Sequence, residues 1–159
     1  MFTLTRTNSS HTDFIKLVRA LDAELDIYNG DENKFYSQFN AIDSLQHTIV
    51  LHQDKLPIAC GAFKPIDLGD ADLSSDKHTV EIKRMYVLPE YRSKGAASQV
   101  LHELERWASA LGHTSCVLET GKFLKPAVAL YTKSGYAIIQ NYGQYEGVEE
   151  SVCFEKKLY

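Results

Sequence analysis

A strand with a slip in its side-chain alternation, followed at once by an amphipathic helix, constrains this chain more than any other feature. Val80 and Ile82 alternate on one face of a predicted strand over residues 79–88. The next apolar side chain on that face is due at position 84, which holds Arg84, and the apolar pattern resumes at Met85. A one-residue shift moves later side chains to the other face, so the slip predicts a β-bulge, or else a plain irregularity of an edge strand.

The helix that follows is predicted over residues 95–111 and is stopped by Gly112. Its apolar side chains recur at the i, i+3, i+4, i+7 spacing of a helix with one buried face: Ala97, Val100, Leu101, Leu104, Trp107, Ala108 and Leu111.

The rest of the chain changes its hydrophobic period repeatedly, which is typical of a mixed α/β domain. Helical spacing predicts helices over 12–29, 31–40 and 126–134, and alternation predicts strands over 2–7, 48–51, 57–63, 117–119, 136–140 and 151–154. The second and third of these strands form a hairpin around Asp54 and Lys55. With 159 residues, the sequence predicts one α/β domain over residues 1–159, in which a mixed β-sheet is flanked by about four helices.

Composition narrows the class of protein. A net charge of -4 argues against nucleic-acid binding, which needs a basic face. The first residues lack a signal peptide and no apolar run is long enough to span a membrane, so we expect a cytoplasmic protein that does not bind membranes. Three isolated cysteines are expected to be buried and reduced, although one of them could be reactive instead: Cys60, Cys116 and Cys153.

No metal site is expected. The start of a zinc motif at His102 fails because Arg106 stands where a second histidine is needed. The acidic loop that starts at Asp70 lacks the glycine that a calcium loop needs at its sixth position, which holds Ser75.

The turn between the bulged strand and the amphipathic helix combines small residues with positive charge. It runs from Arg92 through Ser93, Lys94, Gly95 and Ala96 to Ala97. Small residues let a ligand approach the backbone, and a helix start offers unpaired N–H groups, which together suit a pyrophosphate. A basic turn with no ligand is the alternative. The glycine-rich patterns of ATP-binding and dinucleotide-binding loops are both absent.

The run from Glu81 to Ala97 resembles the central motif of the GNAT N-acetyltransferase superfamily, a bulged strand followed by R/Q-x-x-G-x-G/A and a helix. Residues 118–121, 127–136 and 154–158 resemble the later strand, helix and terminal strand of that family. The resemblance implies the GNAT fold and an acyl-CoA-dependent N-acyltransferase that moves acetyl from acetyl-CoA to a primary amine by direct attack in a ternary complex. The alternative is a non-catalytic acyl-CoA sensor on the same fold.

The resemblance also implies how the coenzyme is held. The backbone of Met85, Tyr86 and Val87 is expected to pair with the pantetheine arm, and Arg92 through Ala97 to hold the pyrophosphate. Thr120, where many relatives carry asparagine, is expected to contact the coenzyme, and Lys133 to reach its phosphates.

Two residues are candidates for the chemistry. Glu81 is the candidate base, because alternation places it opposite Val80 and Ile82, and the competing interpretation is an exposed strand glutamate. Tyr131 is the candidate acid, which without the family resemblance reads as a core aromatic residue. Glu119 is a weaker candidate base and is otherwise an ion-pair partner.

The acceptor amine is expected to bind among aromatic and acidic side chains, although core packing and a solvated loop explain the same residues. They are Tyr28, Asn29, Phe35, Tyr36, Glu119, Tyr142, Tyr145 and Glu146. The partner is therefore a small-molecule or peptide amine, and the resemblance also allows a homodimer.

Overall fold

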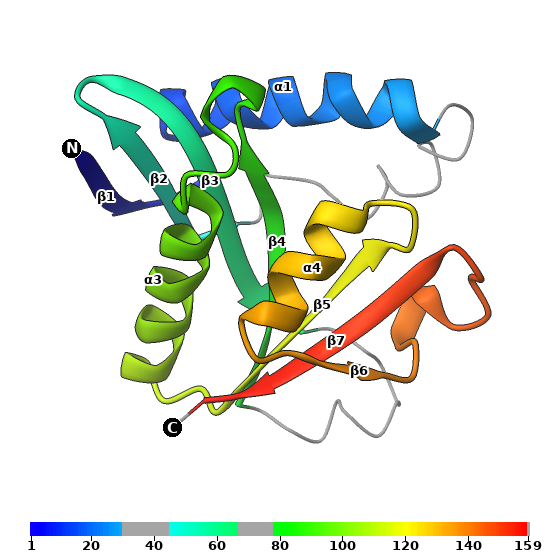
Figure 1. Cartoon of the computed structure of the whole chain (residues 1–159). Helices are drawn as coiled ribbons and strands as arrows, with labels where there is room; N and C mark the ends of the chain where they lie inside the picture. Colours follow the sequence, from blue (N-terminus) through cyan, green and yellow to red (C-terminus); the bar gives the residue numbers. More distant parts are fainter. Residues whose placement is uncertain (30–44, 67–77, 159) are drawn as a thin grey trace. The chain divides into compact units, whose positions relative to one another are not determined.

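One mixed sheet of seven strands organises the computed structural model, which describes residues 1–29, 45–66 and 78–158 (Figure 1). Its strands lie in the order β1-β2-β3-β4-β5-β7-β6. Their bounds are Phe2–Thr7 for β1, His47–Gln53 for β2, Leu56–Pro65 for β3, Thr79–Val87 for β4, Ser115–Gly121 for β5, Ala137–Ile139 for β6 and Ser151–Lys157 for β7. The predicted mixed α/β sheet is confirmed.

Three α-helices accompany the sheet within the described ranges. They are α1 (Thr12–Asn29), α3 (Ala96–Ala110) and α4 (Lys125–Lys133). The helix predicted over 31–40 lies outside the described residues, as does most of the acidic loop after Ile66. Leu111 follows the end of α3 and is 51% exposed, so its place on the buried face of the helix was predicted wrongly.

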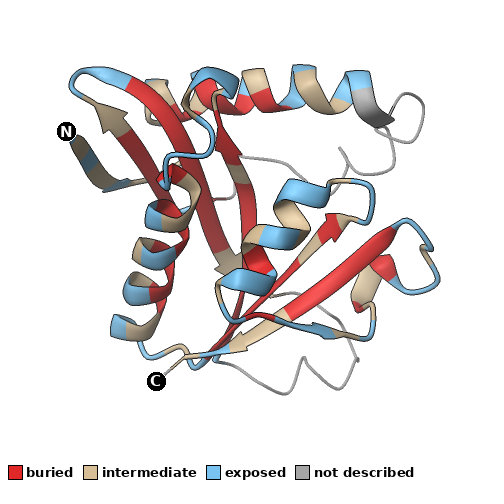
Figure 2. Cartoon of the chain, in the orientation of Figure 1, coloured by how far each residue is buried: buried red, intermediate tan, exposed pale blue. Residues whose placement is uncertain are grey.

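The sheet combines antiparallel pairs with one parallel pair in the described residues. β1, β2 and β3 pair in succession antiparallel, and β2 and β3 form the predicted hairpin. β4 and β5 are parallel, and the helix α3 comes between them in the sequence. β7 pairs antiparallel with both β5 and β6. Figure 2 shows the inner strands of the sheet buried along most of their length, whereas the edge strands β1 and β6 are not, and the helices are buried on one side only.

By contact density the chain divides into two units. The first comprises Met1–Lys64 and Lys83–Leu104, and the second comprises Pro65–Ile82 and Glu105–Tyr159. β4 contributes to both, with Thr79–Ile82 in the second unit and the remainder in the first. The single domain over residues 1–159 stays a prediction.

The first unit packs helices on both faces of its strands. One face carries a cluster of buried side chains from α1, β2, β3 and β4: Phe14, Leu17, Val18, Leu21, Val50, Cys60, Ala62 and Tyr86, together with Leu45 before β2. Gly61 points to the other face, where a Cβ would lie 2.5 Å from Met85 Sδ and 2.9 Å from side-chain atoms of Val100 and Leu104. α3 therefore rests directly on the backbone of β3.

The second unit packs α4 against β7. The ring of Tyr131 lies 5.9 Å from that of Phe154 and 5.8 Å from that of Tyr136. The Tyr136 hydroxyl donates to Glu105 Oε2 at 2.9 Å, and Lys156 Nζ donates to Glu105 Oε1 at 2.9 Å. All three cysteines are free and buried, as predicted.

Candidate active site

The turn before α3 leaves its backbone open. Residues 92–95 are exposed, and Ser93 and Gly95 both have left-handed backbones, with φ of 65° and 84°. A Cβ built on Gly95 would find no heavy atom within 4 Å. An open glycine in a left-handed conformation lets a ligand approach the main chain closely, as the sequence predicts for a pyrophosphate.

The start of α3 adds hydrogen-bond donors to this turn. The helix begins at Ala96, and the N–H of Gln99 donates to the carbonyl of Gly95 at 3.1 Å. The N–H groups that precede Gln99 at the helix start have no acceptor within the helix, and the helix dipole makes this end positive. The turn therefore has the features of an anion-binding site.

Arg92 is held in place beside the turn. Its NH2 group donates to both carboxylate oxygens of Glu24 on α1, at 2.9 and 3.0 Å. Its Nε donates to the carbonyl of Val87 at 2.9 Å, and its guanidinium carbon lies 5.5 Å from the ring centre of Tyr86. The guanidinium thus keeps a fixed place in the first unit, whereas Lys94 is exposed above the ring of Tyr91.

The left-handed backbone of Arg84, with a φ of 58°, interrupts the extended strand β4 at the position where the sequence predicts a bulge. Its side chain is 3% exposed, and its NH2 group donates to Asp22 Oδ1 on α1 at 2.6 Å. Its carbonyl accepts the thiol of Cys60 at 3.4 Å. Such a bulge turns the strand backbone away from regular pairing.

Residues 85–87, at the C-terminal end of β4, provide the backbone that the family resemblance assigned to the pantetheine arm. In the described residues, the pairing of β4 with β5 covers Thr79–Glu81. On the β3 side, the N–H of Leu88 donates to the carbonyl of Ile58 at 2.8 Å. Residues 85–87 come after the paired residues of β4 in the sequence, and an added extended chain would need an unpaired backbone edge there.

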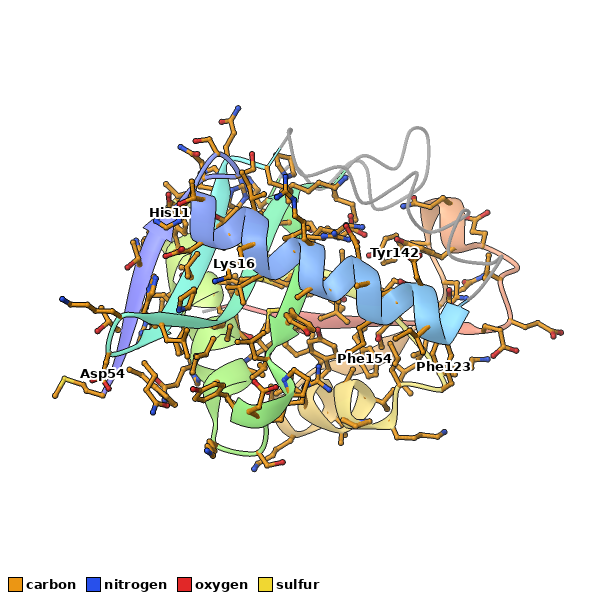
Figure 3. The ribbon with its side chains drawn as sticks, turned by 90° about the horizontal axis from the view of Figure 1, so that it is seen from above. His11, Lys16, Asp54, Phe123, Tyr142 and Phe154 are labelled. Carbon is orange, nitrogen blue, oxygen red and sulfur yellow. The ribbon has the colours of Figure 1, made fainter. Side chains whose placement is uncertain are left out.

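Glu81 is buried in the second unit, with 4% of its surface exposed. The hydroxyl of Tyr142 donates to Glu81 Oε2 at 2.6 Å (Tyr142 is labelled in Figure 3). Burial and the neighbouring Glu81 carboxylate raise the pKa of Tyr142 well above its usual value, so this proton stays on the tyrosine. The interpretation of Glu81 as an exposed strand glutamate is wrong.

Tyr131 is the buried residue of α4 and is 6% exposed. Its hydroxyl makes no hydrogen bond to any other residue in the described part of the chain. Burial, and then the charge of Glu119, raise the pKa of Tyr131 above its usual value. The phenol therefore stays protonated near neutral pH.

The remaining candidates of the second unit occupy different environments. Glu119 is half-buried and its Oε2 accepts the hydroxyl of Ser151 at 2.6 Å. Thr120 lies within β5, which is longer at both ends than the predicted strand, and is 9% exposed. Lys133 is exposed at the end of α4, where it is free to reach outward.

The acceptor candidates separate into two groups. Tyr142 and Tyr145 are buried, at 4% and 2% exposed, which excludes a solvated loop as the explanation of these two residues, and Glu146 is exposed. Four candidates have side chains outside the described residues: Tyr28, Asn29, Phe35 and Tyr36.

Sequence reasoning missed Glu24, Asp22 and Ser151, which hold Arg92, Arg84 and Glu119. No short-range pattern marks these residues, because each partner lies at least 30 positions away. In the described ranges no helix is long and apolar enough to cross a membrane. The same residues contain no group of three metal-ligating side chains.

The Acetyltransferase (GNAT) family model matches residues 15–136, more than half of the chain. The IAA acetyltransferase of Azospirillum brasilense is 26% identical over 157 residues, which cover 98% of this chain and 97% of that protein. The uncharacterized N-acetyltransferase YjgM of Escherichia coli is 39% identical over 76 residues, or 48% of this chain and 42% of that protein.

Solved structures share the fold. A Klebsiella pneumoniae protein assigned to the acyl-CoA N-acyltransferases superimposes with a TM-score of 0.78 at 25% identity, over 100% of this chain and 99% of that one. The N-acetylglutamate synthase of Neisseria gonorrhoeae, in complex with coenzyme A and N-acetyl-glutamate, gives a TM-score of 0.69 at 14% identity, over 100% of this chain and 35% of that one. With the bulged strand and the open turn at the start of α3, these matches place the chain in the GNAT acetyltransferase family.

Proposed function

We propose that this protein is an N-acetyltransferase that transfers acetyl from acetyl-CoA to a primary amine by direct attack in a ternary complex. The observation that carries the proposal is the buried Glu81 carboxylate, of which one oxygen accepts the Tyr142 hydroxyl. The other oxygen has no hydrogen-bond partner among the described residues. A carboxylate held in this way has one oxygen to accept a proton.

The first unit would hold the coenzyme. Arg92 and the open turn through Ala97 would bind the pyrophosphate at the start of α3. The backbone of residues 85–87 would pair with the pantetheine arm. This assignment is supported by the left-handed, unobstructed Gly95 and by the family membership of the chain.

The second unit would carry the proton transfers. Bound acetyl-CoA supplies the thioester that is attacked. Glu81 would take the proton that the amine loses as the new C–N bond forms, and Tyr131 would give its proton to the sulfur as the C–S bond breaks. Backbone N–H groups freed by the bulge at Arg84 would stabilise the oxyanion.

The acceptor is proposed only as a class, a small-molecule or peptide amine. Glu81 and Glu119 supply negative charge, and the ring of Tyr145 supplies an aromatic face, which together suit a cationic group. The names of the relatives point to different acceptors, so they support the transferase class and no single substrate. A cytoplasmic location and a homodimer belong to the same proposal.

Release of free coenzyme A from acetyl-CoA, measured with a thiol reagent across a panel of amines, tests the proposal. Wild type should release the thiol in an amine-dependent way, and Glu81→Gln and Tyr131→Phe should each lower kcat by about 10²–10⁴-fold, as loss of a general base or acid does. The matched control is Tyr136→Phe, which removes a buried hydroxyl that donates to Glu105. Binding of acetyl-CoA without turnover of any amine would overturn the transferase and support the sensor.

A further inference from the structure

Hydrogen bonds within the connection between β6 and β7 hold this loop in place, and they thereby set the direction of the Tyr142 side chain. The side-chain amide of Asn141 donates to three backbone carbonyls, those of Tyr145 at 3.2 Å, Val148 at 3.0 Å and Ser151 at 3.1 Å. A 3-10 turn over Gly143–Tyr145 shortens the loop further. Tyr142 therefore projects from a loop that is hydrogen-bonded to the start of β7.

The Tyr142 side chain is held by ring packing as well as by a hydrogen bond. It lies 5.8 Å from the ring of Tyr145 in an edge-to-face arrangement, and it is 4% exposed. Its hydroxyl donates to Glu81 Oε2 at 2.6 Å, which is the short distance of a hydrogen bond to a charged acceptor. In the described part of the chain, no other side chain is hydrogen-bonded to this carboxylate.

We propose that Tyr142 is a positioning residue that holds Glu81 Oε2 and thereby aims Oε1 at the acceptor amine. The proposal rests on the acetyltransferase function given above. The proton of the amine moves to Oε1, and the Tyr142 proton stays on the phenol throughout. This role replaces the contact with the acceptor that the sequence suggested for Tyr142.

One consequence separates this role from a structural one. The hydrogen bond restricts the rotation of the carboxyl group, so its loss leaves the base less often in the productive orientation and lowers kcat without weakening amine binding. A tyrosine that only filled space would leave kcat unchanged.

The test compares Tyr142→Phe with Tyr136→Phe in the full chain. Both substitutions remove a hydroxyl that donates to a buried carboxylate of the second unit, at 2.6 Å to Glu81 and at 2.9 Å to Glu105. kcat and KM for the best amine are measured for both variants. Loss of the fixed carboxylate orientation should lower kcat of Tyr142→Phe about tenfold to a hundredfold.

In the same variant KM for the amine should stay within about threefold, because Tyr142 does not contact it. Tyr136→Phe should lose stability and keep the wild-type kcat. An unchanged kcat in a folded Tyr142→Phe protein overturns the positioning role alone. A wild type that turns over no amine overturns the transferase and this role together.

A second variant tests the proposal if Tyr142→Phe does not fold. Substituting 3-fluorotyrosine at position 142 keeps the ring and its packing but makes the hydroxyl a stronger donor. kcat should then stay close to the wild-type value, in contrast to the effect of phenylalanine. A loss of kcat as large as that of phenylalanine would also overturn the proposal.

Discussion

Placing a methyl group on Gly95 separates the coenzyme contact from ordinary helix stability. Gly95 stands before α3 and Gly112 after it, with left-handed φ of 84° and 94°. A Cβ at either position would have no heavy atom within 4 Å. Gly95→Ala and Gly112→Ala therefore impose the same backbone strain without a clash, and only the first places a methyl group where the pyrophosphate is expected.

The magnitudes follow from these conformations. A Cβ on a left-handed backbone costs about 1–2 kcal/mol. For a chain of this size, 1 kcal/mol corresponds to about 2–4 °C in Tm, so both variants should melt about 2–8 °C below wild type. Acetyl-CoA at about 100 times its Kd adds about 2.7 kcal/mol, which raises the Tm of the wild type by roughly 5–11 °C.

Thermal unfolding with and without saturating acetyl-CoA is the assay. Gly112→Ala should keep the full increase in Tm, and Gly95→Ala should keep less than about half of it, because the methyl group holds the phosphates away from the N–H groups. An equal increase in both variants would refute a pyrophosphate over Gly95. Loss of the increase in both would mean that binding depends on the stability of α3 and not on this contact.

Three further predictions follow from the packing. Gly61→Ala should destabilise by about 1–3 kcal/mol in urea unfolding, because its Cβ would meet Met85 Sδ at 2.5 Å. A thiol reagent at pH 8 should find almost no reactive thiol before denaturation and three after it, because burial raises the pKa of all three thiols, to about 12, about 12 and about 11 for Cys60, Cys116 and Cys153. The thiols of the unfolded chain lose their protons from about pH 9, whereas those of the folded chain keep them to a higher pH. The free energy of unfolding should therefore fall from about pH 9 to about pH 12. A flat pH profile in urea unfolding would contradict this.

Local patterns predicted most of the fold, because they report backbone geometry directly. A one-residue slip in alternation identified the bulge at Arg84, and helical spacing located α3 to within one residue at each end. Gly95 was predicted as a close-approach glycine, and its left-handed, open backbone agrees with that reading. Each of these features depends on side chains fewer than about a dozen positions apart.

Partners of the site residues were beyond such reasoning. Tyr142 and Glu81 are separated by 61 positions, and Arg92 and Glu24 by 68. Nothing in either segment specifies the other, since only the pairing of the strands and the loop tied by Asn141 bring Tyr142 to the carboxylate. The burial of Glu81 was missed for the same reason, because strand alternation gives a face and not what covers it.

Backbone strain in the described residues is concentrated around one stretch of chain. Non-glycine residues with positive φ are Asp54, Arg84 and Ser93. Asp54 sits in the hairpin turn after β2, where aspartate commonly adopts this conformation.

Arg84 precedes the stretch proposed to line the coenzyme and Ser93 lies within it, and glycine at either position would avoid a cost of about 1–2 kcal/mol. Arg84 adds a second cost, because its buried Nε has no hydrogen-bond partner. The hydrogen bond from the Arg84 side chain to Asp22 compensates for part of this cost and links the bulge to α1. The bulge is therefore held by a side chain in a conformation that the backbone alone disfavours, which is the pattern expected where function rather than stability selects the residue.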